Sequence, residues 1–187
     1  MWSLSARDVY DKPDRLISID LISPDLLNKL ISHRFYDIDM EKLNDAMEIA
    51  IKFLTDGEVE LLFLKFVHRN SHKTIKKTMQ LGSTKTVSKR CKKLVEAIKN
   101  YVFYFMEQNY DSDISDIRNA FGDDAVVVAE MLFKRMSKNA ILMEKTIPMS
   151  QARIIRTVLN IEILCLKSIK LSGFWEVISS ARKLVKK

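Results

Sequence analysis

Apolar residues return every three or four positions through most of this chain, and few residues break the pattern. Between residues 39 and 54, Leu43, Met47 and Ile51 repeat at this spacing, which predicts an amphipathic helix. Only four glycines and three prolines occur in 187 residues. A β-sandwich or β-barrel needs many more turn residues than this. The sequence therefore predicts an all-α fold built as a helical bundle.

The N-terminal residues give weaker signals. Residues 15–22, RLISIDLI, alternate partly between apolar and polar positions, so they fit a short strand or an extended arm. Ser23, Pro24 and Asp25 then combine an N-cap residue, a first-turn proline and a favourable acid. These three residues predict a helix that ends near Arg34.

Two capping signals follow the helix predicted for residues 39–54. Thr55 and Glu58 have the capping-box spacing and precede the apolar run LLFLKF, which predicts a central helix. The residues HRNS then break this helix. Ser71 is placed to cap a short helix that ends near Gln80.

A longer helix is predicted after a tight turn at residues 81–83, Leu-Gly-Ser. Thr84 is placed to cap it, and it extends to about Asn109. Its apolar stripe contains Val87, Cys91, Leu94, Val95, Ile98 and Val102. The run YVFYFMEQNY at its end either contributes Phe103, Phe105 and Met106 to the core or forms a stacking platform for single-stranded nucleic acid.

The C-terminal part predicts helices at about 113–121, 123–138, 149–170 and 173–186. The third carries a broad apolar surface, which either forms a dimer face or makes this helix the centre of a C-terminal bundle. We expect three regions: residues 1–53, an N-terminal helical region; residues 54–110, a helix-turn-helix region; and residues 111–187, a C-terminal helical region for dimerisation or partner binding.

Positive charge is concentrated in one segment. Residues 65–99 contain eleven lysines and arginines and a single acid, whereas the whole chain has a net charge of +7. The rest of the chain is therefore slightly acidic. Charge gathered in this way favours a polyanionic partner over a general role in solubility.

The basic segment has the layout of a helix-turn-helix unit: a short helix, a turn with a glycine, and a longer basic helix. The width of the DNA major groove accepts one α-helix, whose first residues then face base edges and phosphates. Small, polar and basic residues occupy those positions here. The predicted DNA-binding residues are Lys73, Lys76, Lys77, Thr84, Lys85, Thr86, Ser88, Lys89, Arg90, Lys92 and Lys93.

The region from residue 54 to residue 101 resembles the DNA-binding region four of bacterial sigma factors and the related helix-turn-helix of response regulators. The family pattern L-T-x-x-E-x-x-x-L-x-x-x-F, then S-x-x-x-I, then T-V, is matched by Leu54, Thr55, Glu58, Leu62, Phe66, Ser71, Ile75, Thr86 and Val87. The resemblance implies that residues 84–93 form a recognition helix. Two features depart from the pattern: Lys76 replaces a small residue, and the spacing from Leu81-Gly82 to Thr86-Val87 is one residue shorter. No promoter-melting segment precedes this region, so the chain does not resemble a complete sigma factor.

We therefore expect a sequence-specific, DNA-binding transcription regulator, for which a phage or mobile-element origin is an open alternative. Its partners would be double-stranded DNA and, as open alternatives, RNA polymerase and a second copy bound through the C-terminal helices. The alternative is a phage DNA-packaging or structural protein, such as a small terminase subunit. No cofactor is expected.

An enzyme is disfavoured, because the chain has no glycine-rich phosphate loop, nucleophile elbow or catalytic histidine arrangement. His68 and His72 are four residues apart, but a break lies between them and no further ligand is near in sequence. Five aspartates between residues 111 and 124 are placed as helix N-caps and first-turn acids rather than as a metal site. Cys91 and Cys165 are expected to be reduced and partly buried.

No signal peptide and no apolar run of membrane-spanning length occur in the sequence. We therefore expect a cytoplasmic protein without a membrane partner.

Overall fold

The computed structural model describes residues 39–183 and the side chains of residues 39–179. The helix expected after Ser23 and the strand or arm expected at residues 15–22 lie outside the described residues. Within the described part every regular element is helical, which confirms the all-α prediction. The elements are α3 (Met40–Lys52), α4 (Asp56–Leu62), the π-helix η2 (Phe63–Val67), α5 (His72–Thr78), α6 (Thr84–Glu107), α7 (Tyr110–Phe121), α8 (Asp123–Phe133), α9 (Lys138–Leu142), α10 (Gln151–Lys167) and α11 (Ser172–Lys183).

Backbone contacts divide the chain into two units, one ending at Lys99 and the other beginning at Asn100. The boundary falls inside α6, which begins in the first unit and ends in the second. The sequence placed a boundary at residues 110/111 instead, which lies in the first turn of α7.

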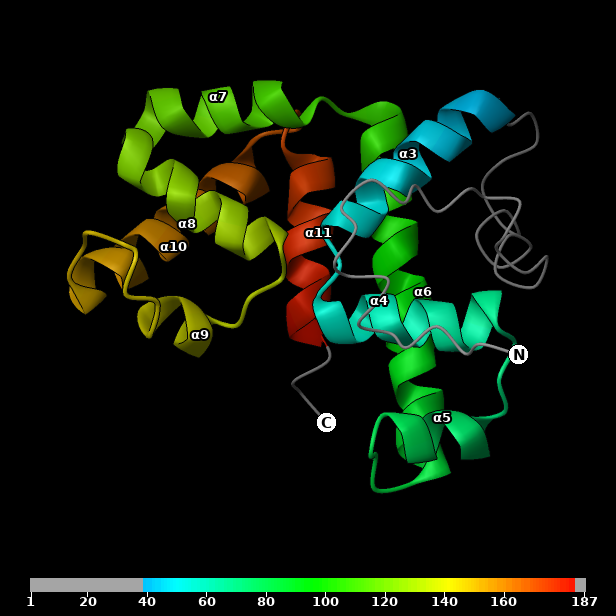
Figure 1. Ribbon diagram of the computed structural model, residues 1–187. Coiled ribbons are helices and arrows are strands. Elements are labelled where there is room, and N and C mark those ends of the chain that lie inside the picture. The colour runs from blue at the N-terminus through cyan, green and yellow to red at the C-terminus, as the bar shows by residue number, and fades with distance from the viewer. Residues whose placement is uncertain (1–38, 184–187) are drawn as a thin grey trace. The chain divides into compact units, whose positions relative to one another are not determined.

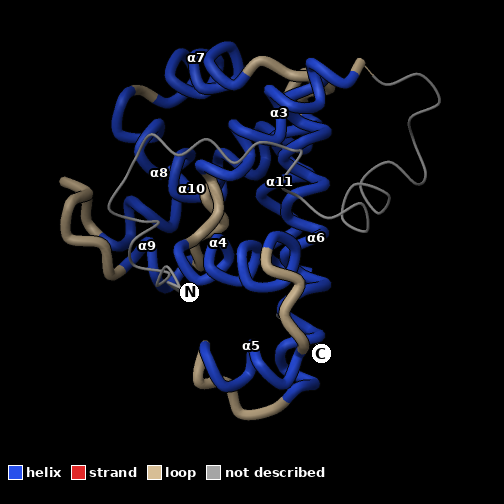
Figure 2. The backbone as a smooth tube through the Cα atoms, turned by 45° about the vertical axis from the view of Figure 1, so that its right-hand side comes forward, coloured by secondary structure: helices blue, strands red, loops and turns tan. Residues whose placement is uncertain are grey.

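The first unit is built on α3, α4, η2, α5 and the start of α6. Figures 1 and 2 show α4 and α5 crossing α6 rather than running along it. Each helix contributes its apolar face to one core, whose fully buried members include Leu43, Met47, Leu61, Leu62, Ile75, Val87, Leu94 and Ile98. The periodicity therefore identified most of the buried residues of α3 and α6, whereas Ile51 and Val95, which were placed on the same faces, are only half-buried.

The helix that follows Thr55 changes its hydrogen-bond pattern halfway. Thr55 and Glu58 form the expected capping box at the start of α4. From Phe63 onward the helix is wider, and the His68 N–H donates to the Phe63 carbonyl at 2.8 Å, five residues back. Arg69, with φ 54°, then ends the helix.

The second unit is organised around a cluster of aromatic rings on α6, α7, α8 and α11. The Phe133 ring lies 4.9 Å from Tyr104, 4.8 Å from Tyr110 and 5.0 Å from Phe174, centroid to centroid. The Tyr101 hydroxyl donates to the Phe133 carbonyl at 2.5 Å. These contacts tie the end of α6 to α8 and α11.

The expected assignment of the run YVFYFM to the core was wrong in detail. Tyr101, Val102 and Tyr104 are buried, whereas Phe103, Phe105 and Met106 are only half-buried. The two tyrosines can be buried because each hydroxyl has a hydrogen-bond acceptor. Their rings are therefore not available for stacking against bases.

The helix expected at residues 123–138 ends early, at Phe133, and a separate short helix, α9, begins at Lys138. Arg135 adopts φ 60°, and the Met136 N–H donates to the Met131 carbonyl at 3.0 Å, which closes the C-terminus of α8. Ser137 then caps α9, and its hydroxyl accepts from the Ala140 N–H at 3.1 Å. A left-handed arginine has no clear sequence signature, which is why this break was not predicted.

The apolar residues of α10 form two sets, one buried and one exposed. Ile154, Val158, Ile161 and Cys165 are buried, and α10 packs on α8, α9 and α11. A second set of apolar residues on the same helix is exposed. The helix is thus a core element of this unit, as one alternative held, and it also retains an uncovered apolar face.

No helix between residues 39 and 183 combines the length and apolar character needed to cross a bilayer.

Candidate nucleic-acid interface

The residues predicted to bind DNA lie on α5 and on the first half of α6, on either side of a short turn. Ser71 caps α5 as expected, and its hydroxyl accepts from the Thr74 N–H at 3.2 Å. At the other end, the Leu81 N–H donates to the Lys76 carbonyl at 2.9 Å, and Gln80 adopts φ 50°. This is a Schellman arrangement, so α5 has defined caps at both ends despite its short length.

The turn differs from the expected one in the residue that caps α6. Ser83, not Thr84, caps α6, because the Ser83 hydroxyl accepts from the Thr86 N–H at 3.1 Å and Thr84 is already helical. The left-handed residue is Gln80, not Gly82. A Cβ added at Gly82 would meet no atom within 4 Å, so neither backbone conformation nor space requires glycine there.

The first half of α6 has a buried face and a cationic face. Val87 and Leu94 are completely buried. Lys85 and Lys89 lie two positions to either side of Val87, and Lys92 lies two positions before Leu94. Two positions along an α-helix are a rotation of about 200°, so these three lysines lie opposite the buried face.

The predicted contact residues differ in their exposure. Lys76, Thr86 and Ser88 are half-buried. The Thr86 hydroxyl lies 3.0 Å from the Ser83 hydroxyl, so it belongs to the helix cap. The other predicted residues are exposed: Lys73, Lys77, Thr84, Lys85, Lys89, Arg90, Lys92 and Lys93.

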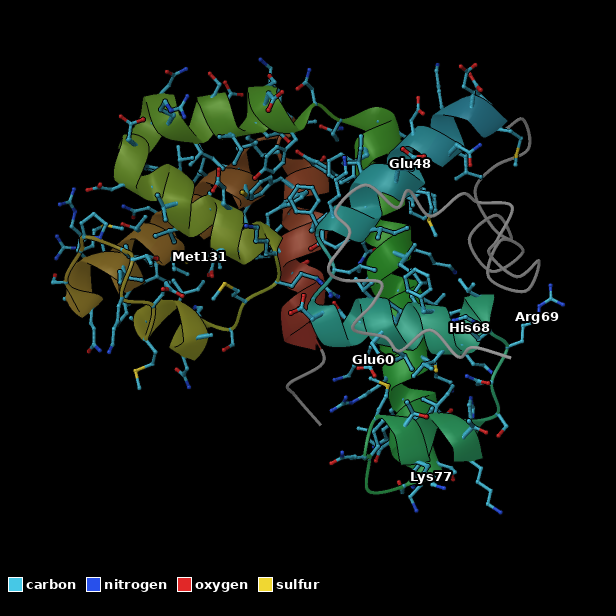
Figure 3. The ribbon with its side chains drawn as sticks, in the orientation of Figure 1. Glu48, Glu60, His68, Arg69, Lys77 and Met131 are labelled. Atoms are coloured by element: carbon cyan, nitrogen blue, oxygen red, sulfur yellow. The ribbon has the colours of Figure 1, made fainter. Side chains whose placement is uncertain are left out.

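Arg69 was counted with the basic charge but not among the predicted contacts. It is exposed at the turn before α5, and Figure 3 shows its side chain and that of Lys77 projecting away from the helices of the unit. The HRNS break, which marks a surface turn, was the signal that could have added Arg69 to the set.

Charge pairing differs between the basic segment and the second unit. Among the described residues, ion pairs join Arg118 to Asp123 at 2.9 Å, Arg153 to Asp124 at 2.9 Å and Lys138 to Glu162 at 3.4 Å. None of the cations between residues 65 and 99 is in an ion pair with a described residue. The positive charge of α5 and of the first half of α6 is therefore not neutralised by an ion pair with any residue that the structure describes.

The aspartates and histidines that were considered as metal ligands lie at helix ends. Asp111 and Asp113 lie in the first turn of α7, and Asp123 and Asp124 in that of α8, as predicted. His68 follows η2 and His72 begins α5. In the described part of the chain, no three metal-ligating side chains lie close enough to hold an ion.

Comparison of the chain with protein-family models, curated proteins and solved structures finds no match. The assignment of a function therefore rests on the residues and geometry above.

Proposed function

We propose that this protein is a DNA-binding transcription regulator, with α4–η2, α5 and α6 acting as a helix-turn-helix module like that of sigma region four. In this proposal α6 enters the major groove with its first turns, and α5 lies over the phosphate backbone. Lysines supply phosphate contacts, and Arg90 with the Thr84 and Ser88 hydroxyls supplies contacts to base edges.

One observation carries the proposal: the lysines of early α6 are exposed, lack acidic partners among the described residues, and include three, Lys85, Lys89 and Lys92, that lie opposite a fully buried face. In the free protein the lysines of this face repel one another, which raises the free energy of the unbound state. A polyanion removes that cost and gains entropy as its counterions are released. An ordinary solvated helix face would instead intersperse acids among its lysines.

Charge reversal tests the proposal. The double variant Lys89→Glu, Arg90→Glu should lower affinity for random-sequence duplex DNA by about tenfold or more, because two phosphate or base contacts become repulsive. Both side chains are exposed, so the thermal midpoint should change little. Fluorescence anisotropy and thermal denaturation measure the two effects.

The matched control is Lys42→Glu, Lys52→Glu on α3, where both lysines are exposed in the same unit. It changes the net charge by the same amount but leaves α5 and α6 intact. If both variants lose affinity equally, net charge alone drives binding. Unchanged affinity in the α6 variant would refute the proposal.

A DNA-packaging protein with the same module is a second candidate, favoured by the exposed apolar face of α10, which offers a surface for assembly. The native mass separates the two functions. A ring of many subunits supports packaging, whereas a monomer or dimer supports regulation.

A further inference from the structure

The α6 face that is proposed to enter the major groove carries few kinds of side chain. Lys85, Lys89 and Lys92 lie two positions from a fully buried residue, a rotation of about 200°, so they point away from the core. Glu96, two positions after the buried Leu94, lies on the same side and is exposed. The groups that this face offers to bases are therefore mainly ammonium ions, together with one carboxylate.

The base pairs differ in the groups that they present in the major groove. Guanine presents two acceptors, N7 and O6, which lysine and arginine contact, whereas adenine presents an acceptor and a donor, which asparagine and glutamine match. Residues 83–99 contain no asparagine and no glutamine. Serine and threonine hydroxyls discriminate little, because a hydroxyl both donates and accepts. Adenine therefore has no matching amide on this segment.

The charged side chains between residues 84 and 99 all favour a G·C pair. Lysine only donates, and Arg90, the one arginine of α6, presents a planar fork of donors, so both match the two acceptors of guanine. The ionised carboxylate of Glu96 only accepts, so it matches the amino group of cytosine, the partner of guanine. For thymine the segment offers only methyl contacts, from Thr84 and Thr86.

The cations of early α6 are positioned to reach several base pairs. Lys85 and Lys92 are about 10.5 Å apart along the helix axis. Because successive base pairs are stacked about 3.4 Å apart, this distance corresponds to about three steps. None of the cations between residues 84 and 93 forms an ion pair with a described residue, so acids of the described chain do not compete for them.

We propose that the α6 face selects guanine-containing duplex DNA by donating to guanine N7 and O6 through Arg90 and its neighbouring lysines. The inference rests on the proposed function, because it requires α6 to enter the major groove. It adds the class of site, which is a run of about four base pairs rich in G·C. Hydrogen bonds from charged donors to a base should distinguish guanine by about fivefold or more.

Replacement of guanine by 7-deazaguanine tests the proposal with the full-length protein. The replacement removes the N7 acceptor from the major groove but keeps the charge, length and base pairing of the duplex. Affinity for a pool of random-sequence duplexes should fall by about fivefold or more when 7-deazaguanine replaces guanine throughout. A pool with 7-deazaadenine in place of adenine should bind as the ordinary pool does. Fluorescence anisotropy measures all three affinities.

Matched variants separate base contacts from phosphate contacts. Lys89→Gln with Arg90→Gln replaces two guanine-matching groups by amides, so the ratio of affinities for the ordinary and 7-deazaguanine pools should fall toward one. Lys73→Gln with Lys77→Gln removes the same charge from α5. It should weaken binding to both pools and leave the ratio unchanged. All four side chains are exposed, so both variants should remain folded.

The outcomes distinguish this inference from the proposed function. Equal, salt-dependent binding of the unmodified protein to the ordinary and 7-deazaguanine pools would overturn the guanine preference and leave the proposed function standing. An equal loss with 7-deazaadenine, or an unchanged ratio in the α6 variant, would also overturn the preference. If no pool binds, the proposed function fails, and this inference fails with it.

Discussion

Asp113 is a buried charged residue at the start of α7, exposed by only 4%. The Tyr104 hydroxyl donates to its Oδ2 atom at 2.5 Å. Loss of solvation raises the pKa of Asp113, and the nearby Asp116 raises it further, while the hydrogen bond from Tyr104 acts in the opposite direction. The pKa of Tyr104 is also raised, by burial first and then by the carboxylate.

The raised pKa of Asp113 makes stability depend on pH. Between the ordinary carboxyl pKa and the raised one, the folded state binds more protons than the unfolded state, so the free energy of unfolding falls as pH rises. Asp113→Asn removes this titration and keeps an acceptor for Tyr104. We expect the variant to gain stability relative to the wild type as pH rises from about 4 to about 7.

Urea denaturation at several pH values measures this difference. Asp111→Asn, at an exposed position in the same first turn, is the control and should not reproduce the trend. If the free energy of unfolding of Asp113→Asn and of the wild type changed with pH in parallel, the pKa of the Asp113 carboxyl would be the same in the folded and unfolded states. That result would contradict the prediction.

At the level of elements, the starts of α3, α5 and α10 were predicted to within two residues, whereas the side-chain caps Ser83, Asn109 and Ser137 were missed. Asp39, Ser71 and Ser150 accept hydrogen bonds at the starts of α3, α5 and α10. Helices that end on a left-handed residue other than glycine were not located to the residue. Gln80 and Arg135 are the cases at the ends of α5 and α8, and Arg69 ends η2 in the same conformation.

The C-terminus of α5 gives a prediction at this scale. A left-handed conformation costs an L-residue about 1 kcal/mol relative to glycine. Gln80→Gly should therefore raise the free energy of unfolding by about 0.5–1 kcal/mol. Gly82→Ala is the control and should not reduce stability, since Gly82 is neither left-handed nor crowded.

Urea denaturation measures both variants. A loss of stability in Gln80→Gly would mean that the side chain of Gln80 contributes more than its backbone conformation costs.

The fold was predicted from the spacing of apolar residues, whereas the candidate site was predicted from the distribution of charge. Charge counting located the cationic face of α6, because eleven basic residues in one segment are visible without coordinates. It could not show that Lys76 and Ser88 are half-buried, or that the Thr86 hydroxyl lies against Ser83, since these depend on how α5 and α6 pack. It also could not divide the apolar surface of α10 into buried and exposed faces.

At the scale of the whole molecule, the two units contain different charge arrangements. The ion pairs described above lie in the second unit, whereas the basic segment, which forms no ion pair with a described residue, lies in the first. Under the proposed function, polyanion binding would therefore belong to the first unit.

The salt dependence of binding to random-sequence duplex DNA tests the central claim most directly. Each lysine that neutralises a phosphate contributes about 0.9 to the slope of log affinity against log salt concentration. The triple variant Lys85→Ala, Lys89→Ala, Lys92→Ala should therefore reduce the slope by about 2.7. Lys42→Ala should leave it unchanged. An equal slope in the triple variant and the wild type would contradict the account, because the cations of α6 would then not contact phosphates.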